Sequence, residues 1–379
     1  MIGNILFILI LARPFISSLS YPALDLYYTY LLIAAFIIVI KLHIPKAKNI
    51  PGQVYLLLFL SALIASTIFS SDPQKSLTAL PTYLAYIFVF LGVYVSSNAE
   101  RKHILHALIA SGALVSLYAI YWFYLGSRHF LDYLQKEQIY YPYALELLSR
   151  NRAFMPFVVP GALSGFLIMM LPLAIGNYWQ QKKQYKDQLA QNTILIFFIA
   201  ITIFALFLTK SVGASLSLFI TVIIFLWSIR PKNIPFVLIV SLLGILALLF
   251  LLRNNNAEDF TTPLFSLQKR WVYWRQTAAV IARHPFLGTG VGNLPFVQSR
   301  YAHNLFLQLW AETGILGIVT FLGFIATCYR LALTKIKDPL WAGCFVAFVS
   351  FLIHNMFDFS FFLPETCLFW WIIAALLLL

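Results

Sequence analysis

A histidine followed by an asparagine stands just ahead of a long apolar run in the last third of the chain. His303 and Asn304 precede the run that includes Gly314-Ile315-Leu316-Gly317. A histidine at a membrane surface is costly to keep without a function, and its ordinary pKa of about 6.5 suits a general base. We therefore expect His303 to be the catalytic residue, with Asn304 in a supporting role.

Arginine and lysine side chains form the second group that could do chemistry. Arg270 and Arg275 are the first candidates for holding phosphate oxygens, because a guanidinium group offers a planar fork of donors. Arg152 and Lys210 are the next candidates, and Arg300 is a supporting one. A simpler alternative stays open, namely that these side chains only contact lipid headgroups.

Carboxylates are too scattered to predict a metal site, so we expect neither a metal ion nor a cofactor. Apart from one adjacent pair, the acids of the predicted outer loops stand far apart in the sequence: Asp132, Glu137, Glu146, Glu258, Asp259 and Glu312. Glu312 is a candidate for capping a helix or pairing with an arginine. His354 and Asp358, at i and i+4, would share a helix face, where a structural and a chemical role both remain open.

A glycine-rich segment, Gly288-Thr289-Gly290-Val291-Gly292-Asn293, lies upstream of the histidine. A dinucleotide-binding loop would need a preceding strand and a following helix in a soluble βαβ unit, and neither is predicted here. We favour a flexible turn that redirects the chain over a backbone nest for phosphate.

The composition indicates which elements must position these residues. Of 379 residues, 61% are hydrophobic and only 10% are charged, and the mean hydropathy is +0.85. A soluble domain carries roughly a quarter charged residues, so that class is excluded. Cys328, Cys344 and Cys367 lie in apolar runs and are expected to pack rather than to form disulfides. We predict an all-α membrane protein with about twelve transmembrane helices in one polytopic domain, residues 1–379.

The predicted spans are 2–16, 26–41, 52–70, 79–98, 104–124, 158–178, 193–209, 212–229, 234–252, 314–334, 339–357 and 365–379. If the N-terminus is cytoplasmic, every short inner loop is basic, as the positive-inside rule requires, and both termini are inside. No Lys or Arg precedes Arg13, which favours an uncleaved first helix over a signal peptide. The rest of the net charge of +13 then falls largely in two outer loops, 125–157 and 253–313.

The second outer loop contains a predicted surface helix. Ser266 is a candidate N-cap, and the step His284-Pro285 would end the helix after about Arg283. An apolar stripe at three- and four-residue spacing is formed by Trp271, Trp274, Ala278 and Ile281. We predict an amphipathic helix on the membrane surface, with Trp271, Tyr273 and Trp274 as anchors that have no chemical role.

Several of these segments match a known pattern. His303-Asn304, then nine residues, then Gly314-Ile315-Leu316-Gly317 resembles the signature of the O-antigen ligase and polymerase superfamily, and the stretch from His284 to Asn293 looks like that family's lead into the histidine. Three further stretches resemble the family: Arg152-Ala153-Phe154 with Pro160–Gly165, Thr209–Ala214, and His354–Asp358 with Pro364. The resemblance covers residue 150 to the end.

The resemblance implies a GT-C-like inner-membrane glycosyltransferase. Such enzymes transfer a glycan from undecaprenyl diphosphate to an acceptor hydroxyl on the periplasmic face, without a nucleotide sugar or metal. His303 would orient or deprotonate the acceptor, and the arginines would neutralise the diphosphate. Val212 stands where the family often has an arginine, and Lys210 would supply only a point charge there.

The acceptor and one rival class stay open. Ligation to lipid A core is favoured slightly, while polymerisation onto another lipid-linked glycan and transfer to a protein hydroxyl remain alternatives. A transporter of an anionic lipid-linked glycan would also want a basic cavity, but it would typically show repeated halves and charged or broken helices at mid-membrane. Membrane lipids are expected partners, and nucleic acid is not, because the positive charge is divided between two sides of a membrane.

Overall fold

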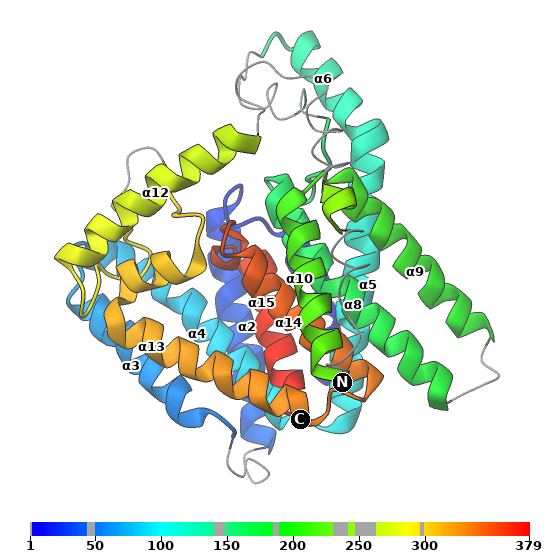
Figure 1. Cartoon of the computed structure of the whole chain (residues 1–379), viewed down its shortest axis with the longest axis horizontal. Helices are drawn as coiled ribbons and strands as arrows, with labels where there is room; N and C mark the ends of the chain where they lie inside the picture. Colours follow the sequence, from blue (N-terminus) through cyan, green and yellow to red (C-terminus); the bar gives the residue numbers. More distant parts are fainter. Residues whose placement is uncertain are drawn as a thin grey trace.

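Helices joined by turns and loops make up the computed structural model over the residues that it describes, which are 2–43, 50–139, 148, 151–184, 189–229, 242–246, 263–295 and 299–379 (Figure 1). The helices of the first half are α1 (Ile2–Ala12), α2 (Pro22–His43), α3 (Gln53–Ile68), α4 (Pro73–Val95), α5 (Asn98–Tyr121), α6 (Ser127–Lys136) and α8 (Pro160–Gln184). Those of the second half are α9 (Leu189–Leu208), α10 (Val212–Ile229), α12 (Pro263–Arg283), α13 (Leu305–Thr334), α14 (Pro339–His354) and α15 (Pro364–Leu377). No strand occurs in this described part, and the predicted all-α class is confirmed.

Each predicted span except one coincides with a helix. The exception, 234–252, lies outside the described residues apart from the helical stretch 242–246. Parts of the two predicted outer loops, including Glu146, Arg150, Arg253, Glu258 and Asp259, also lie outside them. Within loop 125–157 the structure continues α5 through the π-helix η3 (Trp122–Gly126) into α6, which projects beyond the bundle (Figure 1).

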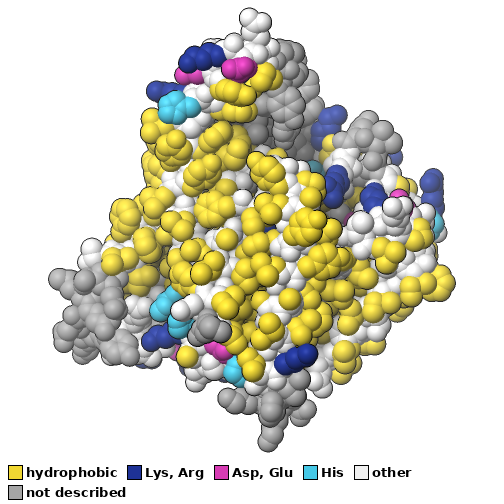
Figure 2. Space-filling model, turned by 180° about the vertical axis from the view of Figure 1, so that it is seen from behind, with side chains coloured by type: hydrophobic (Ala, Val, Ile, Leu, Met, Phe, Trp, Pro, Cys, Tyr) yellow, Lys and Arg dark blue, Asp and Glu magenta, His cyan; other side chains and the backbone are white. Residues whose placement is uncertain are grey.

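The molecule has the surface of a membrane protein. Five helical stretches of the described chain are long and apolar enough to cross a bilayer, namely Pro22–His43, Pro73–Val95, Asn98–Lys136, Pro160–Gln184 and Leu305–Thr334, and shorter apolar helices accompany them. In Figure 2, hydrophobic side chains cover the middle of one face, while charged and histidine side chains gather toward its edges. The membrane class is confirmed, and the total of about twelve spans stays a prediction.

The centre of the bundle is the C-terminal helix α15. It is apolar on all sides, as expected of a helix surrounded by others, and Trp370 and Trp371 are almost fully buried. The Trp370 ring stacks on Phe348 of α14 with centroids 4.8 Å apart, and Trp371 stacks on Phe324 of α13 at 5.3 Å. These contacts fix the C-terminal helical pair α14–α15, whose connecting turn carries part of the candidate site.

Local sequence signals explain several helix starts. Asp72 and Asp338 each cap a helix that begins with proline, and their carboxylates accept backbone N–H groups of the first turn. Ser97 and Glu100 form a capping box at α5. Such caps satisfy donors that a membrane interior could not.

Helix α12 corrects two predictions. It begins at Pro263, before the predicted cap Ser266, and a proline fits the first turn because its missing N–H is not needed there. It ends at Arg283, as expected. The predicted apolar stripe is divided, since Ile281 is buried against α13 while Trp271 is 60% exposed. One side of α12 therefore packs on the protein, so the helix lies across the end of the bundle (Figure 1).

Candidate functional site

The glycine-rich segment forms a clasp with α13, and this clasp places the histidine. Helix α13 is broken at Gly314, which has a φ of 67° that only glycine adopts easily. The break leaves backbone groups unpaired, and residues 285–290 pair with them. Thr289 N donates to Ala311 O at 2.9 Å, Gly290 N to Glu312 O at 3.1 Å, and Ile315 N to Pro285 O at 2.8 Å.

The clasp settles the role of the glycines. Gly288, Gly290 and Gly292 all have positive φ, and a Cβ on Gly288 would lie 2.3 Å from the Glu312 carbonyl carbon. The segment is the predicted turn, but it is packed rather than loose. The N–H groups of Gly288, Gly290 and Gly292 donate to protein oxygens, so the phosphate-nest alternative is wrong at these positions.

Glu312 anchors the same loop. Its buried carboxylate accepts Gly292 N at 2.9 Å and Gln308 Nε2 at 2.7 Å. A residue that the sequence offered as a partner for an arginine thus holds backbone and amide donors, and this position supports the loop that leads to the histidine.

Asn304 joins two loops. Its side-chain oxygen caps α13 by accepting Leu307 N at 3.0 Å, and its amide donates to Met356 O at 3.1 Å. Leu305 N donates to Asn355 O at 2.7 Å. The His303-Asn304 motif is therefore tied to the turn between α14 and α15, which carries Asp358.

His303 lies in an aromatic setting with its ring nitrogens uncommitted. The ring stacks on Tyr273 of α12 with centroids 5.7 Å apart and meets the Phe359 ring edge-on at 4.8 Å. Its φ of 53° is unusual for a non-glycine residue, and such conformations cluster at functional sites. Neither ring nitrogen forms a hydrogen bond within the described chain, and Nδ1 is buried.

The electrostatics of His303 favour the neutral ring. Burial lowers its pKa to about 4, with the Asp358 charge acting against that shift and the Arg270 charge adding to it. The imidazole is therefore unprotonated at neutral pH and can accept a proton.

Arg270 and Arg275 separate in the structure. Arg270 is partly buried, its Nε has no hydrogen-bond partner among the described residues, and its charge acts on both His303 and Asp358. Burial lowers the pKa of Arg270 while Asp358 opposes this, and the guanidinium stays charged. Arg275 is exposed, because five residues turn a helix by about 140°. Only Arg270 of this pair faces the histidine.

The turn after α14 supplies a carboxylate. Helix α14 ends at His354, so His354 and Asp358 do not share a helix face as predicted; the turn itself brings their atoms together, with Nε2 and Oδ1 3.7 Å apart. Burial opposes ionisation of Asp358, but the charges of His354, His303 and Arg270 and the Ser360 N–H outweigh it and hold the pKa of Asp358 below its usual value.

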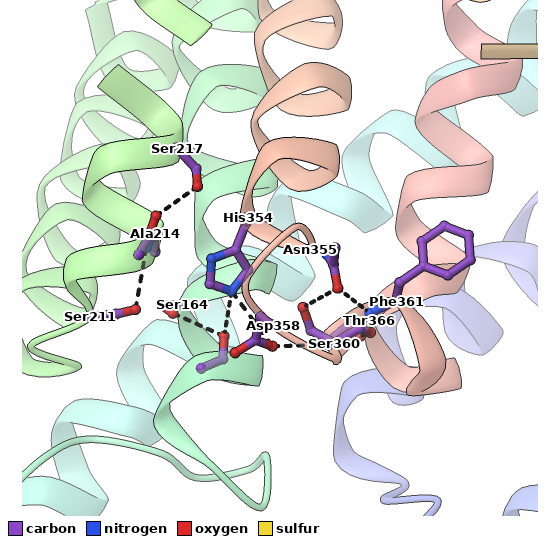
Figure 3. Close-up of polar contacts among 12 residues, drawn as sticks. Ser164, Ser211, Ala214, Ser217, His354, Asn355, Asp358, Ser360, Phe361 and Thr366 are labelled. Carbon is purple, nitrogen blue, oxygen red and sulfur yellow. Dashed lines mark hydrogen bonds and ion pairs between the residues drawn. The ribbon is translucent and has the colours of Figure 1, made fainter. Parts of the chain in front are cut away.

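Figure 3 shows His354 between the first turns of α8 and α10, with its ring directed toward Asp358. His354 Nε2 lies 3.1 Å from Gly161 O at the start of α8, and a Cβ on Gly161 would lie 2.3 Å from Asp358 Oδ2. A Cβ on Gly213 of α10 would lie 3.8 Å from His354 Nδ1. His354 therefore packs between Asp358 and the first turn of α10.

The turn before α10 brings two more candidates together. Lys210 lies in it with a φ of 48°, and Arg152 Nε donates to Thr209 O at 2.7 Å. Ala153 N donates to Leu208 O at 2.9 Å. The structure therefore brings Arg152 and the Lys210 turn together, on the His354 side of the site.

A cavity lies next to Tyr301. The Tyr301 ring stacks on Phe359 with centroids 4.7 Å apart, and a cavity of about 430 Å³ is lined by Tyr301, Arg300, Lys75 and Glu312, among others. Arg300 reaches over the Tyr301 ring at 5.6 Å. The structure places this supporting candidate in the cavity and not beside His303.

Sequence reasoning missed two contributions. Tyr273 was expected to be only a membrane anchor, yet its ring contacts His303. Gly161 belongs to the Pro160–Gly165 stretch, to which the sequence assigned no role in the site. In the structure it lies against Asp358. Helical spacing could have indicated Tyr273, since it lies three residues after Arg270 and shares its side of α12.

Two comparisons with known proteins bear on this arrangement. Residues 197–322, which include Lys210, Arg270, Arg275, His303 and Glu312, match a family model described as O-Antigen ligase. The chain is also similar to an O-antigen ligase of Salmonella typhimurium, with 25% identity over 232 residues. That alignment covers 53% of this chain and 55% of the relative, so it spans about half the length of each. Over these residues, and in the motifs around His303, the chain is similar to the O-antigen ligase and polymerase superfamily.

Proposed function

We propose that this protein transfers a glycan from undecaprenyl diphosphate to an acceptor hydroxyl at the periplasmic face of the bacterial inner membrane. The observation that carries the proposal is the meeting of three chain segments at one place. Tyr273 of α12 stacks on the His303 ring, and Phe359 from the turn after α14 meets that ring edge-on. Arg270 lies one helical turn before Tyr273 and Asp358 lies next to Phe359, so both charges act on His303. A proton acceptor beside a cation is the arrangement that transfer from a diphosphate would need, and this supports the proposal.

His303 is the general base of the proposed reaction. The acceptor hydroxyl oxygen attacks the anomeric carbon, the bond from that carbon to the diphosphate oxygen breaks, and the diphosphate leaves with the electron pair. The hydroxyl proton passes to a ring nitrogen of His303, which is neutral at pH 7. The nearby Asp358 carboxylate then stabilises the imidazolium ion.

Arg270 stabilises the charge that develops on the leaving diphosphate. Its guanidinium is partly desolvated, which strengthens its attraction to an anion. Lys210 supplies further positive charge from the α9–α10 turn, and so does Arg152, which bonds to that turn through Thr209 O. Val212, at the start of α10, stands where the family often has an arginine. Arg275 has a lesser role at the membrane surface, because it is exposed on another side of α12.

Lipid A core is the acceptor that we favour, and both named matches carry the description O-antigen ligase. Growth of another lipid-linked glycan and transfer to a protein hydroxyl are the alternatives. A deletion strain distinguishes them. Loss of long glycan on lipid A with intact lipid-linked polymer indicates a ligase. Capping of lipid A with a single repeat indicates a polymerase, and unglycosylated protein indicates transfer to a protein hydroxyl.

The direct test is transfer in vitro from purified undecaprenyl-diphosphate glycan to each acceptor, with and without a chelator. The wild type should be active and insensitive to the chelator, and His303→Ala should lose activity about 10²–10⁴-fold, the usual contribution of a general base. His129→Ala is a matched control, because His129 lies on the projecting helix α6.

Two outcomes would contradict the proposal. Full activity of His303→Ala would remove the catalytic assignment. Lack of transfer to any acceptor, together with movement of the lipid-linked glycan across vesicles, would favour the transporter.

A further inference from the structure

An apolar groove lies between α8, α10 and α14, away from the candidate site. Its volume is about 870 Å³, which is within the usual range for ligand sites. Its walls come chiefly from aliphatic and aromatic side chains of α8 and α10, namely Leu171, Ile175, Trp179, Leu218, Val222 and Phe225.

Small residues create the groove. A Cβ on Gly176 of α8 would lie 2.5 Å from Pro339 O, and one on Gly343 of α14 would lie 2.5 Å from Pro172 O. The two helices therefore meet backbone to backbone, as small residues allow in membranes. Gly176, Ala342 and Gly343 also line the groove and leave it without large side chains on that side.

The mouth of the groove is basic. Lys182 and Lys183 from the end of α8 and Lys337 from the turn before α14 line it, and no acidic residue is among the described lining residues. The Lys182 ammonium lies 5.1 Å from the Trp179 ring centroid. A tryptophan and lysines at the end of a membrane helix are typical of the headgroup layer. The neighbouring Asp338 caps α14 through its carboxylate.

The groove belongs to the far leaflet. Pro160 begins α8 next to Gly161, which contacts Asp358, and Lys182 lies near the other end of the helix. With a rise of 1.5 Å per residue, these ends are about 33 Å apart, which is close to the thickness of a bilayer's hydrocarbon core. The lysines and the His303 site thus face opposite sides of the membrane.

We propose that this groove binds an anionic phospholipid of the leaflet opposite the candidate site. One acyl chain lies along Leu218, Val222 and Phe225, and the phosphate meets the three lysines. Charge complementarity selects an anionic headgroup over a zwitterionic one, as basic pockets between membrane helices do. The inference does not depend on the glycosyltransferase proposal.

Native mass spectrometry of the full-length protein tests the proposal. Delipidated protein is titrated with phosphatidylglycerol, cardiolipin or phosphatidylcholine. We expect at least one phosphatidylglycerol or cardiolipin to stay bound roughly tenfold more tightly than phosphatidylcholine, and we expect Lys182→Ala/Lys183→Ala/Lys337→Ala to lose that preference. The matched control replaces three exposed cations outside the groove, Lys41, Lys102 and Arg330, and should keep it.

A second pair of variants tests the apolar part. Val222→Trp fills the groove and should displace the bound lipid, whereas Leu57→Trp, at an exposed site on α3, should not. Equal binding of all three lipids by the wild type would overturn the proposal. So would equal loss in the groove and control variants, which would indicate general adhesion of lipid to a basic surface. Folding of every variant is checked by circular dichroism.

Discussion

Arg13, which is buried, and Arg270, which is partly buried, have opposite surroundings. Arg13, which is 1% exposed, donates to Ile16 O at 2.7 Å, pairs with Asp25, and has Glu365 at 3.8 Å. Arg270 has charged neighbours, but its Nε forms no hydrogen bond in the described chain. The first arginine is satisfied by the protein and holds the segments of α1, α2 and α15 together. The second is held by the fold without being satisfied, which suits a residue that meets a ligand.

The largest expected effect is on stability, at Arg13. Arg13→Ala would leave Asp25 and Glu365 buried without their cation, and breaking such a pair costs about 3–5 kcal/mol. We expect poor membrane insertion and a large fall in thermal stability, measured by fluorescence-detected size exclusion. Arg128→Ala, on the projecting helix α6, serves as the control. A stable Arg13→Ala protein would end the contrast between the two arginines.

Arg270 should show the reverse pattern. Arg270→Ala should keep its fold and lower transfer about 10²–10³-fold, comparable to the loss of one transition-state donor. Arg270→Lys should recover only part of that activity, because an ammonium cannot form a bidentate contact. The rate is measured with saturating acceptor and varied donor. Unchanged donor dependence would return Arg270 to a lipid-headgroup role.

The pH dependence of transfer tests the environment of His303 beside Arg270 and Asp358. Burial lowers the pKa of His303 to about 4, so the neutral base is present above that pH and is lost as the pH falls through it. We expect transfer to persist at pH 5–6, where an ordinary histidine would be largely protonated. Asp358→Asn should move the acidic limb still lower, because the Asp358 charge raises the pKa of His303. The rate is followed from pH 4 to 8, and an acidic limb near pH 6.5 would contradict this environment.

Arg275 should give the smallest effect. Arg275→Ala removes an exposed charge on α12, so we expect a loss of transfer of less than about threefold, typical of a surface charge. In the double variant Arg270→Ala/Arg275→Ala, the increases in the activation free energy of transfer from the two single variants should add. A loss as large as that of Arg270→Ala would show that both arginines hold the donor.

The sequence predicted most of the helices, because long apolar runs and their polar boundaries are local properties. The catalytic role of the His303-Asn304 pair stays a prediction. The sequence could not separate Arg270 from Arg275, since which side of α12 packs on α13 depends on contacts such as Ile281 with Ala311. It also could not show that Glu312 would hold the glycine segment, because that contact requires the break at Gly314. Local sequence patterns therefore predict the helices, whereas tertiary contacts determine which side chains lie next to His303.

The clasp between residues 285–290 and 311–315 has a consequence for biosynthesis. Its two segments are near one another in sequence, so they can pair while the ribosome is still synthesising the later helices. Asp358, in contrast, reaches His303 only after α14 and α15 have entered the bundle, since it lies in the turn between them. A nascent chain that ends before residue 339 could form the clasp, but it would lack both Asp358 and the turn to which Asn304 and Leu305 bond. The order of synthesis therefore completes the charged cluster last, when the whole protein is in place.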